Sequence, residues 1–369
     1  EIAGIMEMGA PGRGEYTRIG TFLDQSIDSE VSGNIIDLCP VGALTSRPYR
    51  FSARSWELQN HNGISPHDCV GANLRVQTLR GVVERVLPRD NEAVNECWLA
   101  DRDRFGYEGV NSPDRLTVPM IREGQEWREV SWEAALKHAV AGLRAVINSG
   151  SAEDVAGLAA PGSSLEEFYL FQKLLRGLGS DNVDHRLQQQ DFSGDETAPA
   201  IPGLEIPIAG FDDTKAVLLV GSNLRKEQPL LSVRLRQVVV RNGATVASVN
   251  VMDYPQTFEL SECAVAPPSR LAATLAGVAV AVARSRNIEL PEEISALANG
   301  PALEQTAAAL HEAGEHGLVL FGANAAQNAA ASSLHAIGQW IAEQTGARIG
   351  LLPTANSAAA WLAGCIPHR

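Results

Sequence analysis

The 369 residues are 45% hydrophobic and 20% charged, a composition typical of packed globular proteins, so wholesale disorder is excluded. Thirty Lys and Arg against 44 Asp and Glu give a net charge of −14, and such a surface repels phosphate, so non-specific nucleic-acid binding is not expected. The length predicts two or three domains, and the five scattered cysteines do not form a disulfide framework. The longest apolar stretches, such as residues 272–283, are too short to span a bilayer, so we expect a soluble, cytoplasmic-type protein.

The first 112 residues divide into two stretches. Residues 1–50 are rich in Gly and Pro, which predicts turns around short elements and no core of their own. Residues 74–79 and 82–87 alternate between apolar and polar side chains, with Arg80 and Gly81 between them, which predicts a β-hairpin. We therefore expect a small β-rich module over residues 51–112.

From residue 113 the pattern changes to alternating strands and helices. Ser131 precedes a helix whose apolar positions recur at helical spacing through Ile147, and residues 155–159 are predicted to form a strand. Ser164 and Glu167 form a predicted capping box, in which each side chain satisfies a free amide at a helix start. That second helix is expected to end near residues 177–179.

Two buried-type strands, residues 216–220 and 318–321, are each followed by a glycine-containing turn. A helix is predicted from Pro229 to Gly243, a strand over residues 245–251, and a later helix ending at Gly346. Strands separated by single helices need crossover connections, so we expect an α/β doubly wound, mostly parallel sheet. Asn223 and Asn324 then lie at strand ends, where a nucleotide-like group would bind.

Two glycine- or histidine-containing motifs are interpreted as structural. Gly12 and Gly14 lack the third glycine and the flanking strand and helix of a phosphate-binding loop, so they predict a turn. His311 and His316 are five residues apart, not four, so their rings diverge on a helix and a solvated helix end is favoured over a zinc site.

Cys39 followed directly by Pro40 is the most informative feature of the sequence. A Cys-Pro pair is how the last ligand of a ferredoxin-type cluster run appears. The alternative is a small buried hydrophobe, since a lone cysteine often packs in a core. A [4Fe–4S] cluster needs about four thiolates, and Cys39 has no companion nearby.

The segment 32–50 that holds Cys39 resembles the large iron–sulfur subunit of NADH–quinone oxidoreductase, respiratory complex I. Residues 65–68 and 99–107 share the resemblance, and further matches lie at residues 184–187, 221–226, 229–231, 355–357 and 362–364. The resemblance implies that Cys39 completes a [4Fe–4S] cluster whose first three cysteines come just before the segment that matches residues 1–4. It thus implies a fragment that lacks those N-terminal ligands and the C-terminal part, and that in its parent passes electrons from NADH toward quinone without catalytic residues.

This family is similar to the wider group of molybdopterin oxidoreductases, which implies three domains. They are the tail of a ferredoxin-like [4Fe–4S] domain over residues 1–50, a β-rich iron–sulfur-type module over residues 51–112, and a truncated molybdopterin-oxidoreductase-like α/β domain over residues 113–369. Some members carry a further cluster in the β-rich module. The matching positions here carry no thiol, and Cys69 and Cys97 are off register, so the resemblance implies a lost cluster; the four positions are Ser65, Asp68, Ala72 and Ala100.

The resemblance leaves alternatives open in the α/β domain. Molybdenum enzymes usually present a Cys, selenocysteine or Ser to the metal, yet no cysteine lies between Cys97 and Cys263. Ser193 is a conceivable oxygen ligand, although a loop or cap residue is favoured, and His185 is expected to be a hydrogen-bonded structural histidine. We therefore expect no molybdopterin and a non-catalytic scaffold, with a molybdopterin-dependent, formate-dehydrogenase-like catalytic chain as the alternative.

The remaining expectations concern charge, cysteines and partners. Arg47 and Arg50 follow Cys39 and would raise the potential of a nearby cluster, or else form surface salt bridges. Cys263 and Cys365 are predicted to be core or chain-end cysteines. The expected partners are other subunits of the peripheral arm of complex I on the cytoplasmic side of the membrane, without nucleic acid. A third reading is an assembly or binding module that, isolated, holds no iron.

Overall fold

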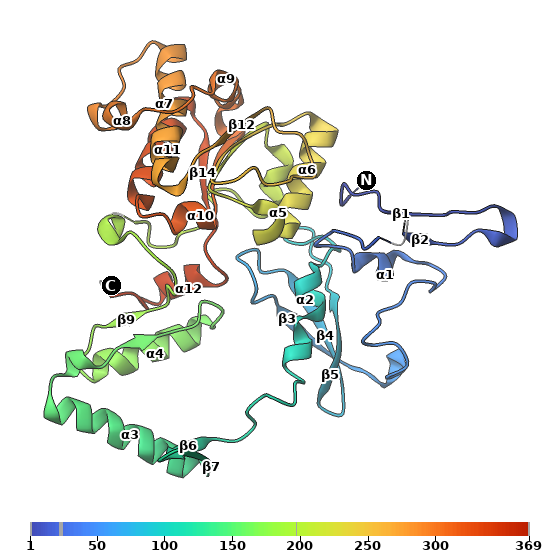
Figure 1. Cartoon of the computed structure of the whole chain (residues 1–369), viewed down its shortest axis with the longest axis vertical. Coiled ribbons are helices and arrows are strands. Elements are labelled where there is room, and N and C mark those ends of the chain that lie inside the picture. Colours follow the sequence, from blue (N-terminus) through green and yellow to red (C-terminus); the bar gives the residue numbers. More distant parts are fainter. Residues whose placement is uncertain (1, 22–24, 197, 368–369) are drawn as a thin grey trace.

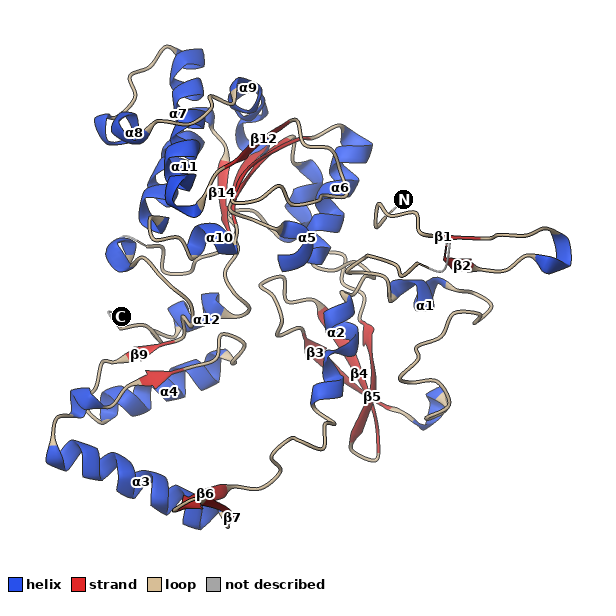
Figure 2. Cartoon of the chain, viewed as in Figure 1, coloured by secondary structure: helices blue, strands red, loops and turns tan. Residues whose placement is uncertain are grey.

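The computed structural model describes residues 2–21, 25–196 and 198–367; the remaining positions, Glu1 among them, lie outside the described residues (Figure 1). Three groups of elements are visible: a sheet flanked by helices, a smaller group below it that contains α3 and α4, and an N-terminal group of short strands (Figure 2). No helix in these ranges combines the length and the apolar character needed to cross a membrane.

A five-stranded parallel sheet forms the centre of the largest group. Its strand order is β12-β11-β10-β13-β14, and every neighbouring pair is parallel. The predicted α/β fold class is thereby confirmed, because parallel neighbours require crossover connections. The strands are β10 (Ala216–Val220), β11 (Thr245–Asn250), β12 (Glu262–Val265), β13 (Gly317–Phe321) and β14 (Arg348–Leu351).

Helices cover both faces of this sheet, which explains why β10 is buried along its whole length. Leu218 belongs to the core beneath α7, α9 and α11, whereas Leu219 belongs to the core beneath α6. Successive side chains of a strand point to opposite faces, so a continuous apolar run is needed here. The helices are α5 (Leu224–Glu227), α6 (Pro229–Asn242), α7 (Leu271–Arg286), α8 (Glu292–Leu297), α9 (Glu304–Ala313), α10 (Ala323–Ala326) and α11 (Ala331–Thr345).

The predicted ends of the sheet-covering helices are confirmed. Pro229 is the first residue of α6, and Gly243 ends that helix in the left-handed conformation with φ 71°. Gly346 does the same for α11 with φ 80°. Glycine adopts positive φ without the steric penalty that other residues pay, which makes it a frequent helix terminator.

The second group joins two helices to short strands. The Ser164 hydroxyl accepts the Glu167 N–H, and the Glu167 carboxylate accepts the Ser164 N–H, so the predicted capping box is confirmed. The predicted strand over 155–159 contracts to two residues, because only these pair with β9. The elements are β6 (Met120–Glu123), β7 (Glu126–Glu129), α3 (Trp132–Ser149), β8 (Gly157–Leu158), α4 (Leu165–Gly177), β9 (Val183–Asp184) and α12 (Ser357–Leu362).

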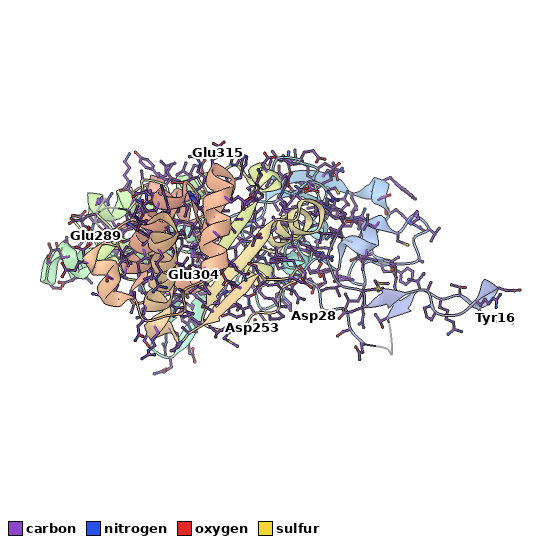
Figure 3. All side chains as sticks on the ribbon, turned by 90° about the horizontal axis from the view of Figure 1, so that it is seen from above. Tyr16, Asp28, Asp253, Glu289, Glu304 and Glu315 are labelled. Atoms are coloured by element: carbon purple, nitrogen blue, oxygen red, sulfur yellow. The ribbon has the colours of Figure 1, made fainter. Side chains whose placement is uncertain are left out.

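The N-terminal group contains a three-stranded antiparallel sheet, order β3-β4-β5, built around the predicted hairpin. Arg80 and Gly81 both have positive φ at its turn, as a tight two-residue hairpin requires. A pair of short strands carries Tyr16 at the tip of a projecting arm (Figure 3). The elements are β1 (Met8–Gly9), β2 (Gly20–Thr21), α1 (Asn34–Leu38), β3 (Gln59–Ile64), β4 (Asn73–Leu79), β5 (Val82–Pro88) and α2 (Asp101–Phe105).

The two remaining cysteine predictions have different outcomes. Cys365 is fully buried against α4, as expected for a core cysteine. The expectation of a core position for Cys263 is wrong: this residue is exposed. It lies on β12, which is the edge strand of the sheet and is paired on one side only. The apolar neighbours of Cys263 in the sequence therefore did not determine its burial.

Candidate functional site

Cys39 lies immediately after α1, at the position where the helix ends. Its N–H still donates to the Ile35 carbonyl, at 3.1 Å, but its ψ of 104° is extended. Pro40 follows and disfavours helical geometry in the preceding residue, so the sequence itself turns the chain at this point. The Gly42 N–H then donates to the Cys39 carbonyl and closes the turn.

The thiol of Cys39 faces a run of backbone amides. Hydrogen bonds from the Leu44 backbone, outweighing the opposing effect of desolvation, lower the pKa of this thiol, and the backbone of residues 41–43 adds to the shift. The side chain is partly exposed. A thiolate is the form that binds metal, so this environment suits a cluster ligand.

Helix α2 anchors α1 and therefore the Cys39 turn. The Asp101 carboxylate accepts the N–H groups of Ser32 and Gly33, at 3.0 and 2.7 Å, together with the Ser32 hydroxyl. The buried Arg104 guanidinium donates to the Asp37 carboxylate at 2.5 Å. Sequence reasoning did not single out these two α2 side chains as anchors, because their partners lie more than 60 residues away in the chain.

Asn34 completes this connection with a buried pair of hydrogen bonds. Its side-chain amide donates to the Leu99 carbonyl at 2.8 Å and accepts the Leu99 N–H at 3.0 Å. Asn34 is 5% exposed and Leu99 is fully buried. The asparagine thus pairs with Leu99 as a strand backbone would, and fixes the start of the helix that ends at Cys39.

The four positions expected to mark a lost cluster lie close to one another and are tied to the neighbouring helix. The Ser65 N–H donates to the Ala72 carbonyl, and the Ser65 hydroxyl donates to Asp103, one turn beyond Ala100. Asp68 pairs with Arg102, although burial raises the pKa of its carboxyl. Ala72 and Ala100 are both buried, at 1% and 0% exposure.

The contacts of α2 connect the β-rich module to the α/β domain and, among the described residues, do not form a metal site. Arg102, besides pairing with Asp68, donates to the Glu227 carbonyl at 2.5 Å, so α2 connects the β-rich module to the α/β sheet. Burial raises the pKa of the nearby Cys69 thiol to about 12, which opposes thiolate formation. Across the described ranges, no group of three or more His, Cys, Asp or Glu side chains could hold a metal ion.

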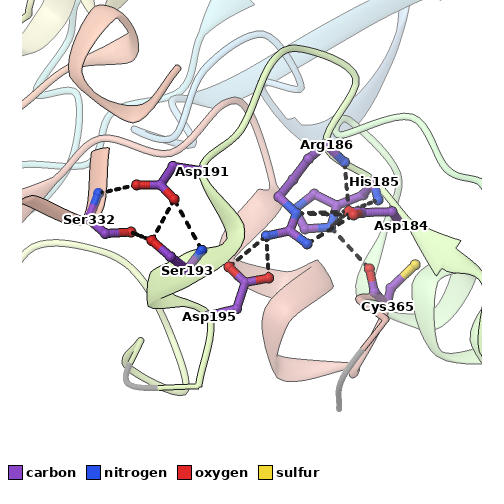
Figure 4. A network of polar contacts seen from close by, with 8 residues as sticks. All are labelled: Asp184, His185, Arg186, Asp191, Ser193, Asp195, Ser332 and Cys365. Atoms are coloured by element: carbon purple, nitrogen blue, oxygen red, sulfur yellow. Dashed lines mark hydrogen bonds and ion pairs between the residues drawn. The ribbon is translucent and has the colours of Figure 1, made fainter. Parts of the chain in front are cut away.

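His185 and Arg186 directly follow β9 and belong to a network of polar contacts (Figure 4). His185 Nδ1 is 3.1 Å from the Cys365 carbonyl, which only accepts, so Nδ1 carries the proton; the predicted hydrogen-bonded histidine is confirmed. Burial lowers the pKa of this ring. Arg186 bridges the carboxylates of Asp184 and Asp195, at 2.9 and 2.8 Å.

Ser193 forms part of a neighbouring hydrogen-bonded turn. Its hydroxyl donates to Asp191 at 2.6 Å and lies 3.0 Å from the Ser332 hydroxyl, so it has the predicted role of a loop residue (Figure 4). A cavity of about 210 Å³ lies beside His185, and apolar residues and a second histidine line it; they include Phe321, Leu351, Leu352, His335 and Trp361.

Asn223 and Asn324 do lie at adjacent strand ends. The Asn324 N–H donates to the Gly221 carbonyl at 2.9 Å, and the Asn324 amide donates to the Tyr254 hydroxyl at 3.0 Å. The Asn223 N–H donates to the Glu227 carboxylate. Sequence reasoning missed Glu227, since an acidic residue in a four-residue helix carries no signal of such a contact.

The arginines expected near a cluster are both exposed. The Arg50 guanidinium lies 5.0 Å from the ring centroid of Phe51, a cation–π contact. An effect of Arg47 and Arg50 on a cluster stays a prediction.

Three family profiles match the chain. Residues 115–347 match "Molybdopterin oxidoreductase"; residues 1–45 match "NADH-quinone oxidoreductase subunit 3, ferredoxin-like domain"; and residues 58–108 match "NADH-ubiquinone oxidoreductase NDSU1/NuoG-like, 4Fe-4S domain". The first match covers more than half of the chain. The second contains Cys39, and the third contains the four lost-cluster positions.

The chain is also similar to named proteins. It is 40% identical over 262 residues to an NADH-quinone oxidoreductase subunit of Rickettsia felis, with 71% of this chain and 38% of the relative covered. It is 36% identical over 266 residues to the NADH-ubiquinone oxidoreductase 75 kDa subunit of Reclinomonas americana, with 68% and 37% covered. The chain thus aligns with less than two fifths of the length of these relatives.

One solved structure shows the same fold. Acetylene hydratase from Pelobacter acetylenicus superposes with a TM-score of 0.52 over 83% of this chain and 42% of that protein, at 12% sequence identity. An identity this low supports a shared fold and nothing about shared chemistry.

Proposed function

The chain belongs to the molybdopterin oxidoreductase family, and we propose that it works as part of the iron–sulfur subunit of an NADH–quinone oxidoreductase, in the path of electrons from NADH toward quinone. The observation that carries the proposal is Cys39: a partly exposed thiol of lowered pKa, held among backbone amides beside Pro40. It lies in a segment that matches a ferredoxin-like profile.

Cys39 would hold one iron of a [4Fe–4S] cluster, which when bound accepts and donates single electrons. The chain's own contribution is to orient the ligand. The amides of residues 41–44 stabilise negative charge on the sulfur, and Asp101 and Arg104 fix the helix that ends there. Since a cluster needs about four ligands, the others would come from further residues of a longer polypeptide such as the relatives have.

Residues 51–112 and 113–369 would act as a scaffold. At the four lost-cluster positions, a serine, an aspartate and two buried alanines stand where thiolates would be needed. The α2 contacts to the Glu227 carbonyl and to the α1 region support a role in holding the cluster segment against the sheet. The partners would be other subunits of complex I, with the protein peripheral to the membrane on its cytoplasmic side.

The test compares cysteine variants in a polypeptide that contains this chain together with the remaining cluster ligands. Cys39→Ala is expected to remove one [4Fe–4S] signal from the electron paramagnetic resonance spectrum of the reduced protein, with an equivalent loss of iron. The matched control is Cys263→Ala, which removes an exposed cysteine far from Cys39 in the sequence and should leave both readouts unchanged. A full cluster signal in Cys39→Ala would refute the assignment.

The molybdopterin-dependent alternative is favoured by the family profile that matches residues 115–347. Metal analysis of the same preparation separates the two functions. The electron-transfer proposal expects iron without molybdenum or tungsten, whereas stoichiometric molybdenum or tungsten would favour the alternative.

A further inference from the structure

The crevice at which β10 and β13 meet is the point where the strand order of the sheet reverses. From β10 the chain continues outward to β11 and β12, and from β13 it continues outward in the other direction to β14. In open α/β sheets, ligands bind at the carboxyl ends of the strands at such a point. The two turns concerned are residues 221–223 and 322–324.

These two turns are packed directly against each other. The Gly322 N–H donates to the Val220 carbonyl at 3.0 Å, and a Cβ atom on Gly322 would lie 2.4 Å from Ser222 Cβ. Gly221 has φ +54°, and a Cβ atom there would lie 2.4 Å from the Ala325 nitrogen. Both glycines are therefore required for the close approach, and little space is left for a ligand between the turns.

The carboxylate of Glu227 bridges the same two turns. One oxygen accepts the Asn223 N–H and the other accepts the Ala323 N–H, each at 3.0 Å. These two amides belong to different strand–turn units, separated by 100 residues in the chain. Burial raises the pKa of Glu227, while the two N–H groups act in the opposite direction.

The first of these two turns contains a buried polar group without a partner among the described residues. Ser222 is fully buried, and within the described part of the chain its hydroxyl oxygen has no hydrogen-bond partner. A buried hydroxyl without a partner is costly and uncommon in a native protein. A polar ligand could form a hydrogen bond with this hydroxyl, and no described protein atom does so.

We propose that Glu227 is a built-in substitute for the anionic group of a ligand, and that it closes the switch-point crevice from within. This inference rests on the proposed scaffold role of the α/β domain. It explains that role physically, because Glu227 would occupy the position that a ligand needs. The molybdopterin that the family name implies does not fit between these two turns, since a carboxylate already bridges their backbone amides and the turns touch. Removing the carboxylate should expose an empty anion position.

Anion rescue of Glu227→Ala in the 369-residue chain tests this directly. The variant is expected to unfold at a temperature roughly 2–6 °C lower, because two amides lose their acceptor. Formate, a detached carboxylate, should restore part of that loss with a saturable dose dependence, relative to chloride at equal ionic strength. The wild-type chain, whose crevice is filled, should show no saturable response.

Glu262→Ala is the matched control. Its carboxylate also accepts a backbone N–H and a hydroxyl, both from Thr306, away from the crevice. Equal formate responses in the two variants, or no response in Glu227→Ala, would overturn the proposal.

A second variant keeps the test decisive if Glu227→Ala fails to fold. Glu227→Gln preserves the shape but turns one acceptor into an NH₂ donor, so hydrogen exchange of the Asn223 or Ala323 amide should accelerate at least tenfold. Unchanged exchange of both amides would count against the proposal. Because neither readout involves iron, failure here is distinguishable from failure of the Cys39 assignment.

Discussion

Replacing Asn34 with alanine tests whether the helix that ends at Cys39 depends on its buried contact with Leu99. The substitution removes the acceptor of the Leu99 N–H and the donor to the Leu99 carbonyl, which lie at 3.0 and 2.8 Å. Leu99 is 0% exposed, so bulk water cannot take over these bonds. The Val31 carbonyl also loses a donor, but this residue is partly exposed and can be hydrated.

The expected cost follows from those two buried groups. Leaving a buried donor or acceptor unsatisfied costs about 1–3 kcal/mol each, and such costs are not fully additive. We therefore expect Asn34→Ala to lower the free energy of opening this region by about 2–5 kcal/mol. At about 1.4 kcal/mol per factor of ten, exchange of the Leu99 amide should accelerate roughly 30- to 3,000-fold.

Native-state hydrogen exchange is the appropriate measurement, because a chain of several units need not unfold in one step. Asn62→Ala is the matched control, since Asn62 is exposed on β3 and its loss should change Leu99 exchange by less than about threefold. If Asn34→Ala leaves the Leu99 amide as protected as in the wild type, the side-chain amide is not what holds α1 in place.

Three further predictions concern the α/β part of the chain. Arg186→Met should lower the free energy of unfolding, measured by chemical denaturation, by about 3–5 kcal/mol, because two carboxylates lose the largely buried cation that they share. A decrease of less than about 1 kcal/mol would contradict this. Gly221→Ala should sharply reduce the yield of folded protein, because the new Cβ atom would lie 2.4 Å from the Ala325 nitrogen at a positive φ, whereas Gly203→Ala, with open space around it, should not. Burial by itself would raise the pKa of the Asp191 carboxyl, but hydrogen bonds from Ser193 and Ser332 outweigh it and lower this pKa to about 2. Its contribution to stability should therefore be present above about pH 4 and lost as the pH falls toward about 2, so Asp191→Asn should flatten the acid limb of the stability profile, and an unchanged limb would argue against this contribution.

The sequence by itself determined the local features of this protein. The alternation on either side of Arg80 and Gly81, the Ser164–Glu167 capping box and the helix-ending Gly243 depend on neighbours within a few residues, so they are readable before folding. The α/β class followed from the order of strands and helices. Cys39 was recognisable because its motif, a Cys-Pro pair, is also local.

Tertiary structure alone decided which side chains work together. The Glu227 carboxylate joins amides 100 residues apart, and Asp101 and Arg104 hold a helix more than 60 residues earlier in the chain. Cys263 is exposed because β12 is an edge strand of the sheet, and the residues next to Cys263 in the sequence do not indicate this edge position. Hydrogen bonding and burial at these sites depend on which segments meet in space, and apolar periodicity and capping motifs carry no information about that.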